Sequence, residues 1–237
     1  MKAQAPVLIK SKEIKQSGMD SVFERYRDLH KGRSAYLIGT GPSVKEVNLD
    51  HLQPDFYRIG VNETVHLNVD LDYWFMGDST YQDPDKFLNQ QEFYRSRVPA
   101  IARFLRINEW PGGERCQMPT DWPLTEYYRG KWVGNPDTCA FTDLGQEPVN
   151  CVASITFDAL QFILHTGITT IYLIGHDCDY SQGTFTGSMV GKHHNAGHWI
   201  LKYWGVVAKW LEENRPDVKI YSVNPVGLTL FEEATLC

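Results

Sequence analysis

The chain has 237 residues, enough for one α/β domain, and its 42% hydrophobic and 22% charged residues are ordinary for a globular protein. Its formal net charge of −6 argues against a general affinity for the nucleic-acid backbone, so nucleic acid is not an expected partner. Five cysteines without a C-x-x-C pair argue against a disulfide scaffold or a zinc knuckle and favour a reducing, cytoplasmic location. The first residues contain no apolar run long enough to predict a signal peptide, and no stretch approaches the roughly 20 apolar residues of a membrane span. Peripheral membrane contact and homo-oligomerisation stay open.

Helical and strand-like segments alternate along the chain. Apolar spacing predicts helices over Ser21–Lys31, 84–97, 154–165 and 199–214. Short apolar runs predict strands over 35–38, 58–62, 71–78, 98–104, 169–175 and 219–224. This alternation predicts a Rossmann-like α/β fold with a doubly wound, mostly parallel sheet in a single domain spanning 1–237.

Residues 105–148 differ in character from the rest. Tryptophan, proline and glycine crowd together there, and the segment is too apolar for a disordered linker and too long for an ordinary connection. We interpret it as an irregular insertion, either a lid that helps to bind an acceptor or a packed loop that covers one sheet edge.

The stretch from Ser34 to Lys45, SAYLIGTGPSVK, runs from a buried strand into a glycine turn. The turn consists of Gly39, Thr40, Gly41, Pro42 and Ser43, and a short helix is expected to begin near Val44. Backbone N–H groups and a helix dipole at such a turn favour a phosphate. The sequence is neither G-x-G-x-x-G nor a Walker A loop, so an ordinary tight turn is the alternative.

Polar residues follow four predicted strands: the glycine turn, Asn62, Asp78, and His176 to Tyr180. Ligands of open α/β sheets bind beyond the carboxyl ends of the strands, so we expect these four segments to meet around one ligand. Hydrogen bonding to loop N–H groups is the favoured role of Asp177, and a helix cap that of Ser154.

Three histidines, His193, His194 and His198, lie within six residues before the last helix. Histidine titrates near neutrality and can act as a general base. His194 and His198 also have the i, i+4 spacing of metal ligands, but no third ligand is obvious, so no metal site is predicted.

With these segments in view, AYLIGTGPSVKEV resembles the GNGPS-type opening of the bacterial sialyltransferases of glycosyltransferase family 42 and of the motility-associated flagellin glycosyltransferases. VASITFDALQFILHTGITTIYLIGHDCDY, residues 152–180, is similar to the Ser-led helix and I-x-L-x-G-x-D strand of the flagellin enzymes. The resemblance covers about two-thirds of the chain and leaves 105–148 unmatched. It implies transfer of a sialic-acid-like sugar from a nucleotide-activated donor, with a CMP-sugar favoured, to a glycan or protein acceptor without an obligatory metal.

The resemblance also implies roles for particular residues. His198 matches the family's base, with His194 in reserve, and Tyr180 matches the first of two tyrosines that hold the departing phosphate, whereas Phe185 replaces the second. The positions matched to nucleotide binding are the glycine turn, Asn62, Asp78, Ser154 and Asp177.

Two departures keep alternatives open. Thr40 and Asp78 stand where the sialyltransferases have asparagine, and an added carboxylate near a phosphate calls for a cation. This favours a second set of relatives, the archaeal 6-hydroxymethylpterin diphosphokinases, which use ATP and Mg²⁺. A non-catalytic nucleotide-binding module is the third reading.

Overall fold

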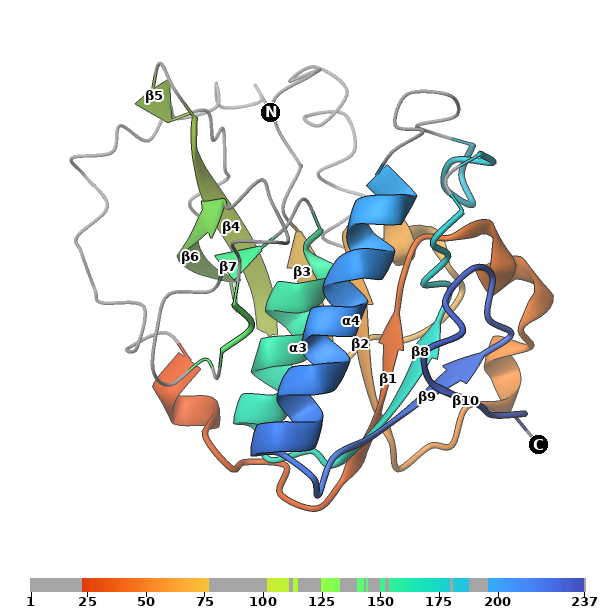
Figure 1. The fold of residues 1–237 in the computed structure, drawn as a ribbon, viewed down its shortest axis with the longest axis horizontal. Coiled ribbons are helices and arrows are strands. Elements are labelled where there is room, and N and C mark those ends of the chain that lie inside the picture. Colours follow the sequence, from red (N-terminus) through yellow and green to blue (C-terminus); the bar gives the residue numbers. More distant parts are fainter. Residues whose placement is uncertain are drawn as a thin grey trace, which may run out of the picture.

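The computed structural model describes residues 23–76, 102–110, 113–114, 125–132, 140–142, 144, 150–151, 154–179, 181–187 and 196–236. Their backbone builds a mostly parallel sheet with helices packed against it (Figure 1). Within these residues no helix combines the length and apolar character needed to cross a membrane.

The sheet has the strand order β10-β9-β8-β1-β2-β3-β4-β6-β7, and all of these pairs are parallel. The strands are β1 (Ser34–Ile38), β2 (Tyr57–Val61), β3 (Tyr73–Met76), β4 (Ala102–Trp110), β6 (Thr125–Trp132), β7 (Asn150–Cys151), β8 (Thr170–Ile174), β9 (Lys219–Val223) and β10 (Glu232–Glu233). The short β5 (Gly113–Glu114) pairs antiparallel with β4.

The strand order reverses at β1. From β1 the chain moves outward through β2 and β3, and it returns to the other side of β1 at β8 before reaching β9. In the register, Leu37 of β1 lies opposite Ile59 of β2 and Leu173 of β8. This arrangement confirms the predicted Rossmann-like, doubly wound fold and places the topological switch point between β1 and β8.

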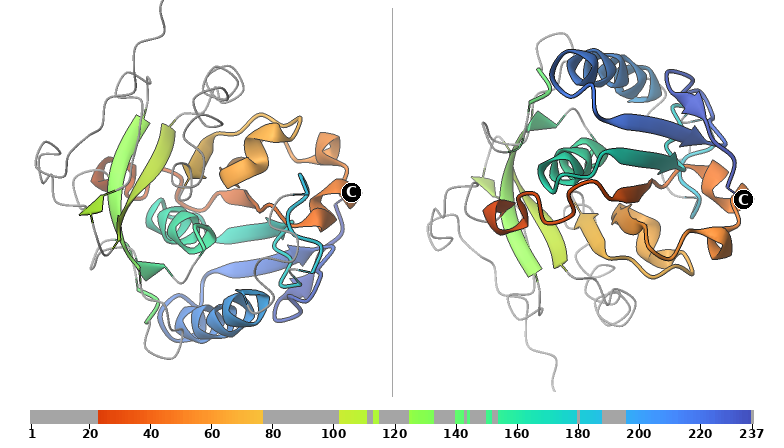
Figure 2. Two further views of the ribbon diagram at one scale, coloured as in Figure 1. Left: turned by 90° about the horizontal axis from the view of Figure 1, so that it is seen from above. Right: turned by 90° about the horizontal axis from the view of Figure 1, so that it is seen from below.

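Alternate side chains of the strands enter two separate cores. Ala35 and Leu37 of β1 face the core that also holds the buried residues of α3 (Thr156–His165) and α4 (Ala196–Asn214). Tyr36 and Ile38 face the opposite core, which is covered by the 3-10 turns η2 (Pro42–Glu46), η3 (Leu49–His51) and η4 (Asn62–His66). Figure 2 shows α4 and these turns on opposite sides of the strands, as expected when the crossovers before and after the switch point use different faces.

The segment 21–31 is not the helix that its spacing predicts. Its described part contains only the 3-10 turn η1 (Glu24–Tyr26), and Asp28 has a φ of 56°. The backbone N–H groups of Asp28, His30 and Gly32 instead donate to the carbonyls of residues 165–167, at 3.0, 2.8 and 2.9 Å. Pairing with the end of α3 therefore replaces the i to i−4 bonds of a helix.

The segment 105–148 is more regular than predicted. β4 continues to Trp110, and β6 lies beside β4 in the same sheet. The prediction of irregular structure is therefore wrong for residues 105–110 and 125–132. The β-forming residues Tyr127 and Tyr128 carried the strand signal, which the nearby Trp and Pro residues obscured. A lid role stays a prediction, and the predicted helix over 84–97 lies outside the described residues.

The larger core is centred on Phe162 of α3. Its ring lies 4.8–5.4 Å, centroid to centroid, from the rings of Tyr26, Tyr73, Phe75 and Phe104. We expect Phe162→Ala to lower the free energy of unfolding by about 3–5 kcal/mol, because it leaves a cavity among rings that cannot collapse. Urea unfolding measures this, with exposed Leu29→Ala as the control, expected within about 0.5 kcal/mol of wild type. Equal losses in both variants would contradict this description of the core.

Candidate functional site

The carboxyl ends of β1, β2, β8 and β9 lie along one edge of the sheet, the upper edge in Figure 1. Left-handed backbone follows three of these strands: Asn62 has a φ of 46°, Gly175 of 68° and Asn224 of 50°. Asparagine adopts this conformation more readily than other residues with a side chain, and such conformations cluster where a fold positions functional groups.

Hydrogen bonds join the segments that follow these strands. The amide of Phe185 donates to the carbonyl of Thr40 at 2.8 Å. The hydroxyls of Thr184 and Thr186 donate to the carboxylate of Glu63 in η4 at 2.8 and 2.7 Å. The predicted meeting of the strand ends is therefore confirmed for the glycine turn, the residues after β2 and the loop after β8. Asp78 lies outside the described residues.

The glycine turn packs directly on the end of β8. The amides of Gly39 and Gly41 donate to the carbonyls of Ile174 and Gly175 at 2.7 and 2.8 Å. A Cβ at Gly39 would collide with the Gly175 carbonyl, and one at Gly41 with the carboxyl group of Asp177. Close approach of two loops of the same chain thus explains why glycine is needed at both positions.

Asp177 occupies the place where the sequence predicts a phosphate. Its carboxylate accepts hydrogen bonds from the amide of Ser43, at 2.9 Å, and from the Ser43 hydroxyl. The side chain is only 9% exposed, and burial raises the pKa of the Asp177 carboxyl although both bonds from Ser43 lower it; the charges of Glu46 and Asp179 raise it further. The predicted bonding of Asp177 to a loop N–H is confirmed.

The short helix expected near Val44 is present, but it is a 3-10 helix and not an α-helix. η2 is a five-residue 3-10 turn that begins at Pro42, and Val47 beyond it is extended, with φ −96° and ψ 126°. Because η2 is so short, no α-helix macrodipole points at the turn. Binding of a phosphate by Gly39–Ser43 stays a prediction, with the constraint that both Ser43 donors already contact Asp177.

His176 is a site residue that the sequence singled out only as part of a strand end. Its Nε2–H donates to the carbonyl of Leu37 at 3.0 Å, and its ring meets Trp204 of α4 edge to face at 6.1 Å between centroids. Burial lowers the pKa of His176 to about 4, so the ring is neutral at pH 7 with Nδ1 as the acceptor nitrogen. The signal in the sequence was its place directly after Gly175.

The remaining candidates lie at the starts of α3 and α4. His198 is exposed in the first turn of α4, and its ring lies 6.2 Å from that of Trp199. The Ser154 hydroxyl accepts a bond from the amide of Thr156 at 3.3 Å, but the N-cap of α3 is Ile155, without a side-chain cap bond, so Ser154 is not the predicted cap and lies one residue before it. Both helices begin at the carboxyl edge of the sheet (Figure 1). Tyr180 and His194 lie outside the described residues, and no trio of His, Cys, Asp or Glu side chains able to hold a metal occurs in the described part.

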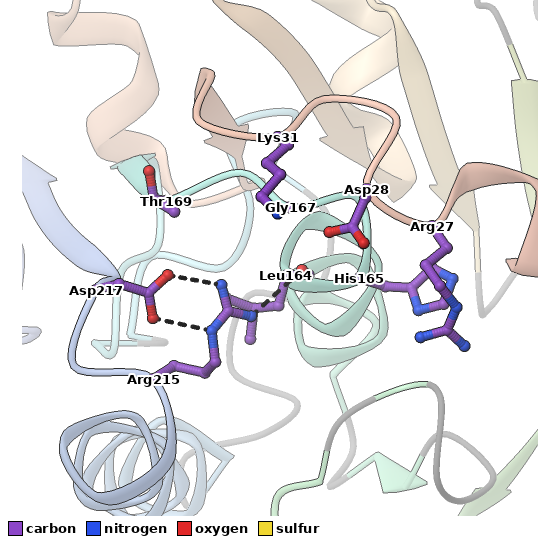
Figure 3. Close-up of a pocket in the computed structure, with 9 residues that line it drawn as sticks. All are labelled: Arg27, Asp28, Lys31, Leu164, His165, Gly167, Thr169, Arg215 and Asp217. Carbon is purple, nitrogen blue, oxygen red and sulfur yellow. Dashed lines mark hydrogen bonds and ion pairs between the residues drawn. The ribbon is translucent and has the colours of Figure 1, made fainter.

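A cavity of about 360 Å³ opens at the opposite, amino-terminal edge of the sheet (Figure 3). It is lined by Arg27, Asp28, Lys31, Leu164, His165, Gly167, Thr169, Arg215 and Asp217. Arg215 pairs with both carboxylate oxygens of Asp217 at 3.0 Å and reaches the Leu164 carbonyl at 3.5 Å. Positive and negative groups thus compensate one another around the end of α3, far from the strand ends that carry the predicted site residues.

The chain resembles solved structures in fold. No family model and no curated protein matches its sequence. The structure is similar to the sialyltransferase CstII from Campylobacter jejuni in complex with the substrate analogue CMP-3FNeuAc, with a TM-score of 0.50 and 12% identity over 86% of this chain and 87% of that one. The sialyltransferase CST-II in complex with a trisaccharide acceptor and CMP gives the same values. A CMP complex of a CST-II variant gives a TM-score of 0.51 and 13% identity over 85% and 86% of the chains. At this identity the likeness establishes a shared fold.

The packing of Gly41 against Asp177 gives a direct test. We expect Gly41→Ala to lower the free energy of unfolding by about 1–3 kcal/mol, because the added methyl group forces the two loops apart. Gly205→Ala is the matched control: a Cβ there meets nothing within 4 Å, and alanine favours the helix by about 0.5–1 kcal/mol. Urea denaturation distinguishes them, and a Gly41→Ala variant as stable as wild type would refute the contact.

The buried His176 makes folding sensitive to acid. The unfolded imidazole binds a proton below about pH 6.5 and the folded one only below about pH 4, so the free energy of unfolding falls as pH falls through this window. The loss attributable to His176 is roughly 3 kcal/mol once complete. We expect His176→Gln to flatten the pH dependence of urea unfolding between pH 6.5 and 4. Burial also lowers the pKa of His30. Because His30 is present in both proteins, it contributes equally to the pH dependence of both. Identical slopes would show that His176 is protonated in the native state.

Proposed function

We propose that the protein is a glycosyltransferase that moves a sialic-acid-like sugar from a CMP-linked donor to an acceptor hydroxyl of a glycan or protein. The observation that carries the proposal is the carboxyl edge at the switch point, where the loops after β1, β2 and β8 are hydrogen-bonded together. The fold is shared over 86% of the chain with sialyltransferase structures in complex with CMP, a CMP-sugar analogue and an acceptor trisaccharide.

In this proposal the nucleotide lies across the switch point. Because Ser43 donates to Asp177, we assign the phosphate contact of the glycine turn to the amide and hydroxyl of Thr40. Asn62, held in left-handed backbone, and Asp78 position the nucleotide and the sugar. Ser154 accepts from a helix amide but keeps its hydroxyl proton for the nucleotide, since a hydroxyl accepts and donates at once.

The transfer step needs a base and a stabilised leaving group. His198 takes the proton of the acceptor hydroxyl as that oxygen forms its bond to the anomeric carbon of the donor sugar. The bond between this carbon and the phosphate oxygen breaks, and CMP leaves with the electron pair while the hydroxyl of Tyr180 stabilises its charge. His194 is the reserve base, and no metal takes part.

Turnover tests the assignment of the base. We expect wild-type protein to release CMP from CMP-sialic acid in the presence of lactose, and His198→Ala to lower kcat by roughly 10²–10⁴-fold, because general-base catalysis contributes that much. His51→Ala, which removes an exposed histidine from η3, is the control and leaves kcat unchanged.

The outcomes separate the alternatives. Wild-type kcat in the His198→Ala variant would remove His198 as the base. Turnover that survives a chelator agrees with the proposal, whereas pyrophosphoryl transfer from ATP that is lost on chelation would replace it with a Mg²⁺-dependent diphosphokinase. A nucleotide that raises the melting temperature without any turnover would favour a binding module.

A further inference from the structure

The loop after β8 crosses the switch point of the sheet. β1 lies between β8 and β2 in the strand order. The loop reaches the turn after β1, where the amide of Phe185 donates to the Thr40 carbonyl at 2.8 Å. It also reaches η4 after β2, where the Glu63 carboxylate accepts bonds from two hydroxyl groups of the loop. Residues 181–187, cyan at the upper edge in Figure 1, therefore extend from β8 over β1 to β2, where open α/β sheets bind their ligands.

Glu63 holds this loop through a single carboxylate oxygen. The hydroxyls of Thr184 and Thr186 donate to its Oε2 at 2.8 and 2.7 Å, and the two hydroxyl oxygens lie 2.9 Å apart. Hydrogen bonds to an ionised acceptor are roughly twice as strong as bonds between neutral groups. Thr186 is exposed, so its side chain is fixed by the bond to Glu63 and not by burial.

Phe185, between the two threonines, anchors the loop in a different way. Its side chain is 8% exposed and belongs to the smaller core together with Ile38 and Val44. Removal of that ring would leave a cavity in the core. Glu63 is half-buried, so a change of its side chain loosens the loop without opening the core. The two anchors can therefore be separated by experiment.

A carboxylate at this edge needs an explanation, because a negative charge repels a phosphate nearby. Glu63 directly follows Asn62, which we assign to the nucleotide and the sugar. We propose that Glu63 is a positioning residue for the donor, which holds the loop 181–187 in place before the nucleotide binds; this rests on the proposed function. The two threonine hydroxyls solvate the charge of the carboxylate. A loop that is already ordered spares the donor the cost of ordering it.

Amide hydrogen exchange of the ligand-free protein tests the contact. We expect Glu63→Ala to speed the exchange of the two hydrogen-bonded amides of the loop, those of Phe185 and Gly187, by roughly tenfold or more, because the loop then opens without global unfolding. Glu63→Gln keeps an oxygen that accepts both threonine bonds, so its exchange should stay within about twofold of wild type. Glu212→Ala, the same truncation at an exposed position of α4, is the control and leaves the exchange of the loop unchanged.

Steady-state kinetics with CMP-sialic acid as donor and lactose as acceptor tests the role of the contact. We expect Glu63→Ala to raise the donor KM roughly tenfold while kcat and the acceptor KM stay within about twofold, because only a fraction of the molecules then has the loop in its binding position. Glu63→Gln should restore the donor KM to within about twofold of wild type, since it keeps the threonine bonds. Thr186→Val, which removes one of the two donors to Glu63, should lie between Glu63→Ala and wild type.

Unchanged exchange in Glu63→Ala would overturn the contact. Faster exchange with an unchanged donor KM would overturn the role in donor binding and leave the proposed function intact. The same conclusion follows if Glu63→Gln keeps a protected loop but has the raised donor KM, since the carboxylate would then act on the donor directly. If the wild type transfers no sugar, the proposed function fails, and calorimetric titration with CMP decides the role separately. Weaker CMP binding by Glu63→Ala supports it, and equal binding, or none by the wild type, overturns it.

Discussion

The arrangement of the carboxyl edge depends on the contact between Asp177 and Ser43. A carboxylate buried to this degree must be compensated, and the amide and hydroxyl of Ser43 compensate it from the neighbouring loop. The same contact brings the end of β8 so close to the turn after β1 that Gly39 and Gly41 have no room for a side chain. The contact between Asp177 and Ser43 therefore explains both glycines of the turn and holds the ends of β1 and β8 together at the switch point.

This contact also changes how a nucleotide can be held. In many α/β proteins a glycine turn and a helix N-terminus leave their N–H groups for a phosphate. Here the chain's own carboxylate takes one of those N–H groups and the hydroxyl of the same residue, Ser43, and the turn leads into a five-residue 3-10 turn rather than an α-helix. Burial raises the pKa of the Asp177 carboxyl above its ordinary value, although both bonds from Ser43 lower it. A ligand that binds at this edge must rely on groups beyond Ser43, of which Thr40 is the nearest in sequence.

The parts of the fold that were predictable carry strong local patterns. β8 is a continuous apolar run and α3 has a regular apolar stripe, and both lie within two residues of their expected bounds. The 21–31 segment has the same helical spacing, but its amides pair with residues 165–167, a long-range contact that spacing does not reveal. β6 was missed because the Trp and Pro residues around it suggested irregular structure.

The site was predictable in outline only. Parallel strands bring their carboxyl ends together, so the meeting of the loops followed from topology. The choice of Asp177 as the partner of Ser43 depends on register and burial, and the neutral state of His176 depends on packing beneath Trp204. Neither can be read from spacing along the chain.

Amide hydrogen exchange with and without CMP tests the central claim, that a nucleotide binds at the carboxyl edge beside the contact between Asp177 and Ser43. The account predicts slower exchange on CMP binding in residues 39–46, 62–66 and 176–187, with no change in 27–31 and 164–169, which line the cavity at the opposite edge. Protection confined to the second pair of segments would place the nucleotide at the wrong end of the sheet and contradict the account.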